Sequence, residues 1–269
     1  MAINALNSAA TGLRALSTRI DVIANNLANA ETTAFKRQRA NFEDLMYSTL
    51  KQPGAQNTAG DIAPAGIQVG HGVKISNTQL DLEQGGLENT GRPFDVAIEG
   101  NGFFRVKVDP NLGDGYAYTR NGNLFVNNQN ELVLGMGDGY KIDPGIQIPT
   151  DANEINISKS GLVQVTRAGQ NTKETVGQLS LYQFVNPNGL TLIGGSLFQQ
   201  TDSSGPFIES RPRENGAGEL LQGFLEASNV DPVKELVTLI KTQRSFELNS
   251  QSIQTADQAL QTIGNLRRF

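Results

Sequence analysis

The stretch that decides the fold is residues 3–29, INALNSAATGLRALSTRIDVIANNLAN, near the start of the chain. Four large apolar side chains recur in it at seven-residue intervals: Leu6, Leu13, Ile20 and Leu27. This spacing places them along one face of a helix. The pattern therefore predicts a single amphipathic helix over residues 3–29.

A second position of the same repeat carries mostly small side chains, which allow a partner helix to approach closely: Ile3, Ala10, Ser17 and Ala24. An isolated helix of this length is marginal in water unless its apolar face is buried. Burying the four large side chains would contribute about 1.5–3 kcal/mol each before ordering costs. On periodicity alone, an ordinary core helix of a globular domain remains an open alternative.

The far end of the chain repeats this plan over residues 233–266, which contain no proline and only one glycine, Gly264. Its seven-residue series is Leu239, Phe246, Ile253 and Leu260. Asp231 suits an N-cap and Pro232 the first helical position. We expect a helix about 50 Å long at 1.5 Å per residue. Much of its remaining surface is polar and uncharged: Gln243, Asn249, Gln251, Ser252, Gln254, Thr255, Gln258 and Gln261.

The centre of the chain has a different pattern, and all ten prolines lie from Pro53 to Pro232. Asn121-Gly122, between two alternating segments, predicts a two-residue hairpin joining residues 116–120 to residues 123–126. Many short strands with frequent turns indicate an antiparallel sandwich or barrel-like domain. The other expected strands lie around residues 94–108, 131–134, 154–157, 162–166 and 176–184.

These patterns predict an α+β chain whose long N- and C-terminal helices form a coiled-coil-like assembly domain. A central, mostly antiparallel β domain and an extended connector complete it. The connector is expected because residues 52–70 are rich in Pro, Gly, Gln, Asn and Ala. The expected parts are the N-terminal helix (1–33), the connector (34–80), the β domain with its return segment (81–226) and the C-terminal helix (227–269).

Composition excludes several classes of function. Residues 53–227 hold eleven Lys/Arg against nineteen Asp/Glu, an acidic balance that argues against nucleic acid as a partner. The short cluster Lys36, Arg37 and Arg39 is interpreted as a solvated helix end. No segment is apolar enough for membrane insertion, and the N-terminus lacks the features of a cleaved signal peptide.

No catalytic, cofactor or metal site is predicted. The chain has no cysteine and a single histidine, His71, to which we assign a structural or exposed role. Residues 109–115 fail as a calcium loop because Arg120 stands where a bidentate Glu is needed. Gly135–Gly139 is not followed by a helix that could hold a phosphate, so both segments are interpreted as turns. A carbohydrate- or peptide-binding β module is more plausible than an enzyme, but it leaves the long ends without a purpose.

Several segments resemble the signatures of bacterial flagellar rod and hook proteins. The terminal ones are Ile23-Ala-Asn25-Asn26-Leu27-Ala-Asn29 with Thr33-Ala-Phe35-Lys36, and Ser228-Asn229-Val230 continuing through Leu236 to Ser250. Three segments inside the chain also match the family: residues 95–104, 118–122 and 197–205. The resemblance therefore covers essentially the whole chain. The segments 37–40 and 42–45 look like those of the distal rod branch of the family. So does the rod-specific segment Gln52, Pro53, Gly54, Ala55 and Gln56.

One position departs from the family pattern. Ala34 stands where the family commonly has Gly, so a left-handed helix cap there would be less comfortable and the path after the first helix is left open.

The resemblance implies a structural subunit of the distal rod and not an enzyme. Such a subunit polymerises into a hollow, rigid drive shaft that transmits torque from motor to hook and encloses the export channel. The implied assembly interface comprises Leu6, Leu13, Ile20, Asn25, Asn26, Leu27, Leu236, Leu239, Phe246, Ile253 and Leu260. We expect Gln254, Gln258 and Gln261 to face the channel.

The implied partners are copies of the same chain, other rod and hook proteins, the surrounding L and P ring proteins and the type III export apparatus. The implied location is the basal-body rod across the periplasm, reached without a cleaved signal peptide. The alternatives are a hook or proximal rod subunit and, from another class, a secreted ligand-binding β module.

Overall fold

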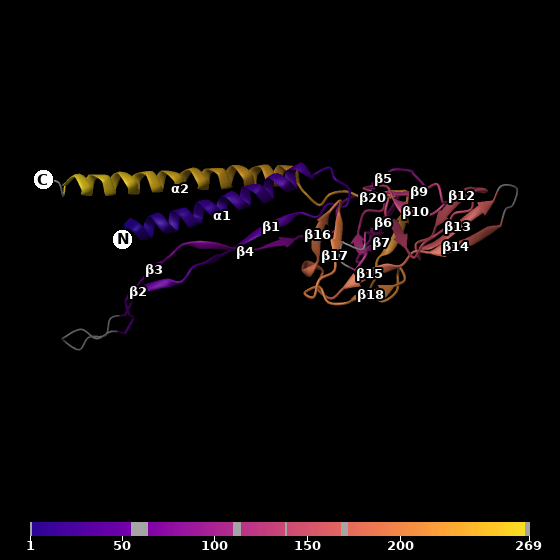
Figure 1. The fold of residues 1–269 in the computed structure, drawn as a ribbon, viewed down its shortest axis with the longest axis horizontal. Helices are drawn as coiled ribbons and strands as arrows, with labels where there is room; N and C mark the ends of the chain where they lie inside the picture. The colour runs from indigo at the N-terminus through magenta and orange to yellow at the C-terminus, as the bar shows by residue number, and fades with distance from the viewer. Residues whose placement is uncertain (1, 55–63, 110–113, 138, 168–171, 267–269) are drawn as a thin grey trace. The chain divides into compact units, whose positions relative to one another are not determined.

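The computed structural model describes residues 2–54, 64–109, 114–137, 139–167 and 172–266. The chain divides into two compact units. The helical unit contains Met1–Ala28, Gln38–Asp81 and Asp231–Phe269, and the β unit contains Asn29–Arg37 and Leu82–Val230. Figure 1 shows the elements of each unit. Within the described residues, neither helix combines the length and the apolar character needed to cross a membrane.

The helical unit contains the two predicted terminal helices, α1 (Ala2–Ala28) and α2 (Pro232–Leu266), which pack against each other. Asp231 is the expected N-cap of α2: its Oδ1 accepts hydrogen bonds from the backbone N–H groups of Val233 at 3.1 Å and Lys234 at 3.2 Å. The Lys234 backbone bond is the main reason why the pKa of Asp231 lies below its usual value, since it favours the charged form.

One face of α1 is buried within a single copy of the chain. Ala15 and Ile23 are buried, and Gly12 lies so close to α2 that an added Cβ would sit 3.2 Å from Nδ2 of Asn249. The seven-residue series of α1 is half-buried, whereas three small residues of the second series are exposed: Ala10, Ser17 and Ala24. Within a single copy, the second series therefore does not form the helix contact that its spacing suggests.

Four strands of the helical unit form two antiparallel pairs. β1 (Gln38–Asp44) pairs with β4 (Val73–Leu80), and β2 (Tyr47–Lys51) pairs with β3 (Ile67–Gly70). The buried amide of Asn26 ties β1 to α1, because it donates to the carbonyl of Gln38 at 2.8 Å and accepts from its N–H at 2.9 Å.

The larger sheet of the β unit has seven strands in the order β16-β17-β8-β7-β11-β10-β9. All its neighbouring pairs are antiparallel, as the sequence predicts. The strands are β7 (Phe104–Lys107), β8 (Tyr116–Thr119), β9 (Leu124–Val126), β10 (Leu132–Leu134), β11 (Lys141–Asp143), β16 (Thr191–Gly194) and β17 (Leu197–Gln199).

Smaller antiparallel sheets complete the unit: β12-β13-β14, β15-β18, β19-β6 and β20-β5. Their strands are β5 (Leu87–Asn89), β6 (Val96–Glu99), β12 (Ala152–Ile157), β13 (Leu162–Arg167), β14 (Lys173–Gln178), β15 (Leu181–Phe184), β18 (Phe207–Ser210), β19 (Glu219–Gln222) and β20 (Phe224–Glu226). One turn of 3-10 helix, η1, covers Pro187–Gly189.

The hairpin predicted at Asn121-Gly122 is wrong. β8 pairs with β7 and β17, while β9 pairs with β10. Asn121 is buried, and its side-chain oxygen accepts from the N–H of Asn123 at 3.0 Å. Gly122 passes so close to β6 that an added Cβ would lie 1.6 Å from the carbonyl oxygen of Val96. The two residues thus cross tightly over a neighbouring strand instead of turning back on their own.

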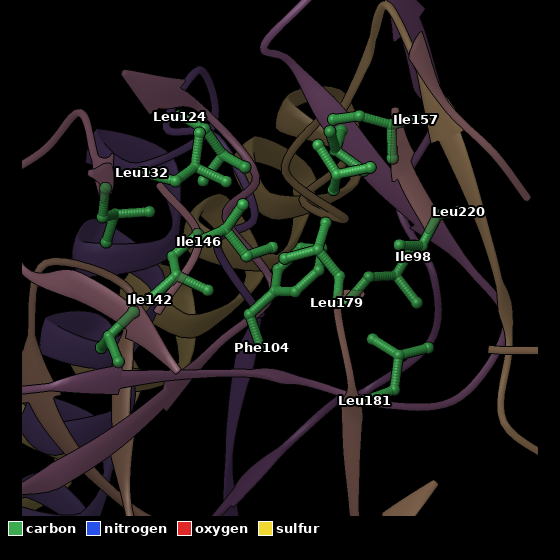
Figure 2. Close-up of a cluster of buried hydrophobic side chains, with 14 of the residues drawn as sticks. Ile98, Phe104, Leu124, Leu132, Ile142, Ile146, Ile157, Leu179, Leu181 and Leu220 are labelled. Atoms are coloured by element: carbon green, nitrogen blue, oxygen red, sulfur yellow. The ribbon is translucent and has the colours of Figure 1, made fainter. Parts of the chain in front are cut away.

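The hydrophobic core of the β unit draws on nearly all of its sheets. Figure 2 shows Ile98 of β6, Phe104 of β7 and Leu181 of β15 pointing into one cluster with Leu220 of β19. The side chains of this cluster are at most 9% exposed. Burying these apolar side chains away from water stabilises the packing of several short sheets against one another.

Candidate functional site

The segment that follows α1 and the segment that precedes α2 lie side by side in the β unit. The N–H of Ala34 donates to the carbonyl of Glu226 at 2.8 Å, and the N–H of Asn229 donates to the carbonyl of Phe35 at 3.3 Å. The Asn229 side-chain oxygen accepts from the N–H of Arg37 at 2.7 Å. The chain therefore enters and leaves this unit through neighbouring, hydrogen-bonded segments.

A third segment, residues 83–86, joins the same place. The carbonyl of Glu83 accepts from Nδ2 of Asn229 at 3.1 Å and from Nζ of Lys36 at 2.6 Å. Gly86 accepts from the N–H of Ala227 at 2.8 Å. Residues 34–37, 83–86 and 226–229 together define what we call the junction.

The centre of the junction is a buried ionic trio. Oε1 of Glu226 lies 2.7 Å from Nζ of Lys36, and Oε2 of Glu226 lies 2.7 Å from Nε of Arg120. The three side chains are 1%, 5% and 0% exposed for Lys36, Arg120 and Glu226. The interpretation of Lys36 as part of a solvated helix end is therefore wrong, because its ammonium group neutralises a carboxylate inside the β unit.

Three further N–H groups of the Arg120 guanidinium donate to backbone carbonyls. Nη1 donates to the carbonyls of Gly100 and Gly102 at 3.0 Å each, and Nη2 donates to Ile98 at 3.2 Å. Burying charged groups is costly unless each is paired and hydrogen-bonded. Since the trio carries one more positive than negative charge, these carbonyl dipoles compensate the excess.

The pKa of Glu226 reflects this environment. Burial alone would raise it, but the charges of Arg120 and Lys36 outweigh burial, together with hydrogen bonds from Lys36 and from the N–H of Gly85. The pKa of Glu226 is therefore lowered from its usual value of 4.5. The carboxylate is charged at neutral pH, and the trio acts as a fixed electrostatic anchor.

Ala34 holds a left-handed conformation, with a φ of 57°, and is 1% exposed. This conformation costs a non-glycine residue about 1–2 kcal/mol. α1 already ends at Ala28, so the turn belongs to the junction and not to a helix cap. The path that the sequence leaves open after the first helix is thus a turn that directs the N–H of Ala34 to Glu226.

A second feature, on α2, is a row of exposed apolar side chains, in which residue 233 is followed by others three, four and seven positions later and residue 240 by another eight positions later. The row comprises Val233 (70% exposed), Leu236 (45%), Val237 (46%), Ile240 (58%) and Leu248 (64%). Spacings of this kind place side chains on one face of a helix. Single exposed apolar residues are normal, but an aligned group on one helix indicates a contact surface.

Three family models match this chain. They describe the flagella basal body rod protein (residues 6–36), the flagellar hook protein FlgE/F/G D1 domain (97–165) and the flagellar basal body rod FlgEFG protein C-terminal region (221–266). The flagellar basal-body rod protein FlgG of Caulobacter vibrioides is 46% identical over 98% of this chain and 100% of its own length. The FlgG proteins of Borreliella burgdorferi and Bacillus subtilis are 44% and 36% identical, each over 99% of this chain and over 99% and 100% of their own lengths.

The chain belongs to the FlgG family of flagellar basal-body rod proteins. It is a structural subunit of the distal rod, in a family of structural proteins and not of enzymes. Within the described residues of this rod subunit, no group of three or more His, Cys, Asp or Glu side chains could hold a metal ion. His71 instead lies 2.7 Å from the hydroxyl of Ser48, through Nε2.

The structure places the residues expected in the assembly interface of this rod subunit in several environments. Asn26 is buried and holds β1, as described above, whereas Asn25 is exposed. Leu236 and Phe246 are 45% and 36% exposed. The remaining members of the set are half-buried: Leu6, Leu13, Ile20, Leu27, Leu239, Ile253 and Leu260.

The expected channel-facing residues Gln254, Gln258 and Gln261 are all exposed on α2. Of the rod-specific segment, Gln52, Pro53 and Gly54 are exposed, while Ala55 and Gln56 lie outside the described residues.

Sequence reasoning missed both the ionic trio and most of the apolar row. Glu226 gives a weak signal, an acidic residue directly after the apolar pair Phe224-Leu225, but nothing in the sequence pairs it with Lys36, 190 positions away. The row was readable from spacing, since Val233, Val237 and Ile240 follow a helical repeat. The seven-residue series on the same helix favoured an interpretation with a single contact face.

Proposed function

We propose that this rod subunit polymerises through its terminal helices into a hollow, rigid helical shaft that transmits torque and encloses the export channel. The observation that carries the proposal is the apolar row on α2. Its members are exposed within one copy, although α1 packs against the same helix. Burying an Ile or Leu side chain stabilises an assembly by about 1.5–3 kcal/mol. Another copy of the chain is the proposed partner that covers this row.

The seven-residue seams support the same arrangement. On α1 the large side chains are half-buried, while Ala10, Ser17 and Ala24 are exposed and small enough for a neighbouring helix to approach closely. Contacts between unlike surfaces of identical copies generate a helix when the rotation does not close into a ring. The proposed interface is therefore the exposed and half-buried residues of the terminal-helix set, with the apolar row added. Asn26 is left out because it is buried and holds β1 within the chain.

The paired strands β1–β4 and β2–β3 supply a second proposed contact between copies. Three apolar side chains of the second pair are exposed: Tyr47 (55%), Leu50 (65%) and Ile67 (54%). Met46, just before β2, is 84% exposed. We assign this surface, with the rod-specific segment Gln52 to Gln56, to non-covalent contacts between neighbouring copies that stiffen the shaft.

Gln254, Gln258 and Gln261 are proposed to line the channel, because neutral amides offer a passing unfolded chain few charged or apolar points of attachment. The partners follow from the same assignment: other rod and hook proteins at the ends of the shaft, and the L and P ring proteins around it. We place the rod across the periplasm and its subunits on the type III export route, without a cleaved signal peptide.

The test is to change Ile240 and Leu248 together to Gln in the full chain and to measure the critical concentration for polymerisation by sedimentation and electron microscopy. Losing two buried side chains should raise this concentration on the order of a hundredfold or more. The monomer should keep its helix content, because both side chains are already exposed.

The matched control is Val185→Gln, which changes an apolar side chain that is 77% exposed in the β unit. This variant should polymerise like the unchanged protein and give straight tubes. If the double variant polymerises at the unchanged concentration, the row on α2 is not the assembly surface. Curved, supercoiled tubes from the unchanged protein would favour a hook subunit over a rod subunit.

A further inference from the structure

A pocket of about 450 Å³ opens on the β unit beside β8, the end of β17 and the segment that leads into β18. Its volume falls in the range of small-molecule sites. The residues that matter for the argument are Asp114, Tyr116, Tyr118, Gln199, Asp202 and Phe207. None of them belongs to the terminal helices or the junction, so the pocket is made of other residues than the surfaces proposed above.

The pocket offers hydrogen-bonding groups that the described part of the chain leaves unused. The carboxylates of Asp114 and Asp202 make no salt bridge there, and the side-chain amide of Gln199 makes no hydrogen bond there. Two neighbouring groups are occupied instead: Gln200 donates to the carbonyl of Gly205 at 3.1 Å, and Thr201 donates to that of Gly189 at 2.5 Å. The free set therefore comprises two acceptors and one amide that both donates and accepts.

The aromatic side of the pocket already holds a cation of the chain itself. The Arg105 guanidinium carbon lies 4.8 Å from the ring centre of Tyr116, 5.1 Å from that of Phe207 and 4.2 Å from that of Tyr182. Its Nε donates to Asp143 at 2.8 Å, which fixes the guanidinium in place. Tyr116 and Phe207 still remain 36% and 39% exposed, so part of each ring is open to a ligand.

These charges select the kind of ligand. An anion would meet two carboxylates, and a cation stacking on Tyr116 or Phe207 would approach the guanidinium that already occupies those rings. A neutral molecule with hydroxyl groups and an apolar face avoids both conflicts. We propose that this pocket binds a neutral pyranose-containing glycan.

In this arrangement the C–H face of one sugar ring packs on the open parts of Tyr116 and Phe207. The sugar hydroxyl groups donate to Asp114 and Asp202 and exchange hydrogen bonds with the amide of Gln199. Aromatic packing contributes about 0.5–1.5 kcal/mol beyond area burial, so a shallow site of this kind gives weak binding on the order of millimolar.

The experiment is saturation-transfer NMR on the full chain below its polymerisation threshold, with the neutral trisaccharides cellotriose, maltotriose and N-acetylated chitotriose as probes. We expect transfer from at least one trisaccharide. Tyr116→Ala should weaken its binding about tenfold, and Gln199→Ala should weaken it several-fold. Gln199 is half-exposed, and its side chain makes no hydrogen bond in the described part of the chain, so this second variant tests the site without disturbing the fold.

The matched control is Phe125→Ala, because Phe125 is 41% exposed and lies 4.7 Å from the guanidinium carbon of Arg92, outside the pocket. This variant should bind the sugar as the unchanged protein does. Tetramethylammonium and glucose 6-phosphate serve as charged probes and should show no binding that depends on Tyr116. The proposal is overturned if no trisaccharide binds, if both pocket variants bind normally, or if a charged probe binds through Tyr116.

Discussion

The helical unit and the β unit bury their apolar side chains to different degrees. In β6 of the β unit, Val96, Ala97 and Ile98 are all 0% exposed. On α2 of the helical unit, Ile240 and Leu248 are 58% and 64% exposed. The difference teaches that β6 lies fully inside the core of the β unit, whereas α2 leaves large apolar side chains exposed, the surface that we propose a neighbouring copy covers.

Removing the charge at the centre of the junction is expected to weaken the β unit most. Glu226→Gln leaves Lys36 and Arg120 buried without their carboxylate, which should lower the free energy of unfolding by about 3–5 kcal/mol. Denaturant titration followed by tyrosine fluorescence measures the effect, because Tyr118 and Tyr182 are buried in this unit.

Glu219→Gln is the control for this change, since it removes one carboxylate of a surface pair with Lys159, where the side chains are 23% and 57% exposed. Surface pairs contribute about 0–1 kcal/mol. Equal effects of the two variants would show that the trio does not anchor the β unit.

Acid should remove the same stabilisation. The pKa of Glu226 is lowered by folding, so its contribution is complete well above its usual value of 4.5 and is lost as the pH falls through the folded pKa. The difference in stability between the unchanged protein and Glu226→Gln should therefore narrow progressively as the pH falls below the usual pKa of 4.5. Denaturant titrations at several pH values check this, and a constant difference would contradict the assignment.

Amide hydrogen exchange should separate the two units in dilute monomer. We expect amides in the middle of α1 and α2 to exchange on the order of a hundredfold faster than those of β6 and β7, because exposed apolar surface leaves the helical unit with less burial to oppose opening. Mass spectrometry of exchanged peptides measures this. Equal protection in both units would mean that the helices are stable without a neighbouring copy.

The smallest expected effect concerns Ala34. Ala34→Gly relieves about 1–2 kcal/mol of left-handed strain but loses a buried methyl group and gains freedom in the unfolded chain. These effects nearly cancel, so stability should change by less than about 0.5 kcal/mol. Ala97→Gly, at a buried strand position with no such strain, should cost at least about 1 kcal/mol more by thermal denaturation. A matching loss in both variants would show that Ala34 is not strained.

The sequence predicts the elements that depend on local chemistry. The helices follow from repeat spacing and from the absence of proline, and the start of α2 follows from the Asp231 cap and Pro232. The short strands around residues 154–157 and 162–166 follow from alternation, and they form the antiparallel pair β12–β13.

What the sequence does not predict is set by contacts between distant segments. Asn121-Gly122 has the composition of a hairpin turn, but the tight crossing over Val96 overrides that local preference. Lys36 lies in a basic cluster typical of a solvated segment, yet its partner Glu226 is supplied by a strand near the other end of the chain. Neither outcome can be found without knowing which strands become neighbours.

The adjacency of entry and exit at the junction has a consequence for how such chains can vary. Backbone hydrogen bonds join Ala34 to Glu226 and Asn229 to Phe35. The two ends of the β unit are therefore held together by contacts within the unit itself. Loops of the β unit that contain neither Arg120 nor residues 83–86 can therefore be lengthened or shortened without moving the residues from which the terminal helices depart. A foreign domain whose own termini lie close together could be inserted into such a loop, leaving the junction and both terminal helices as they are.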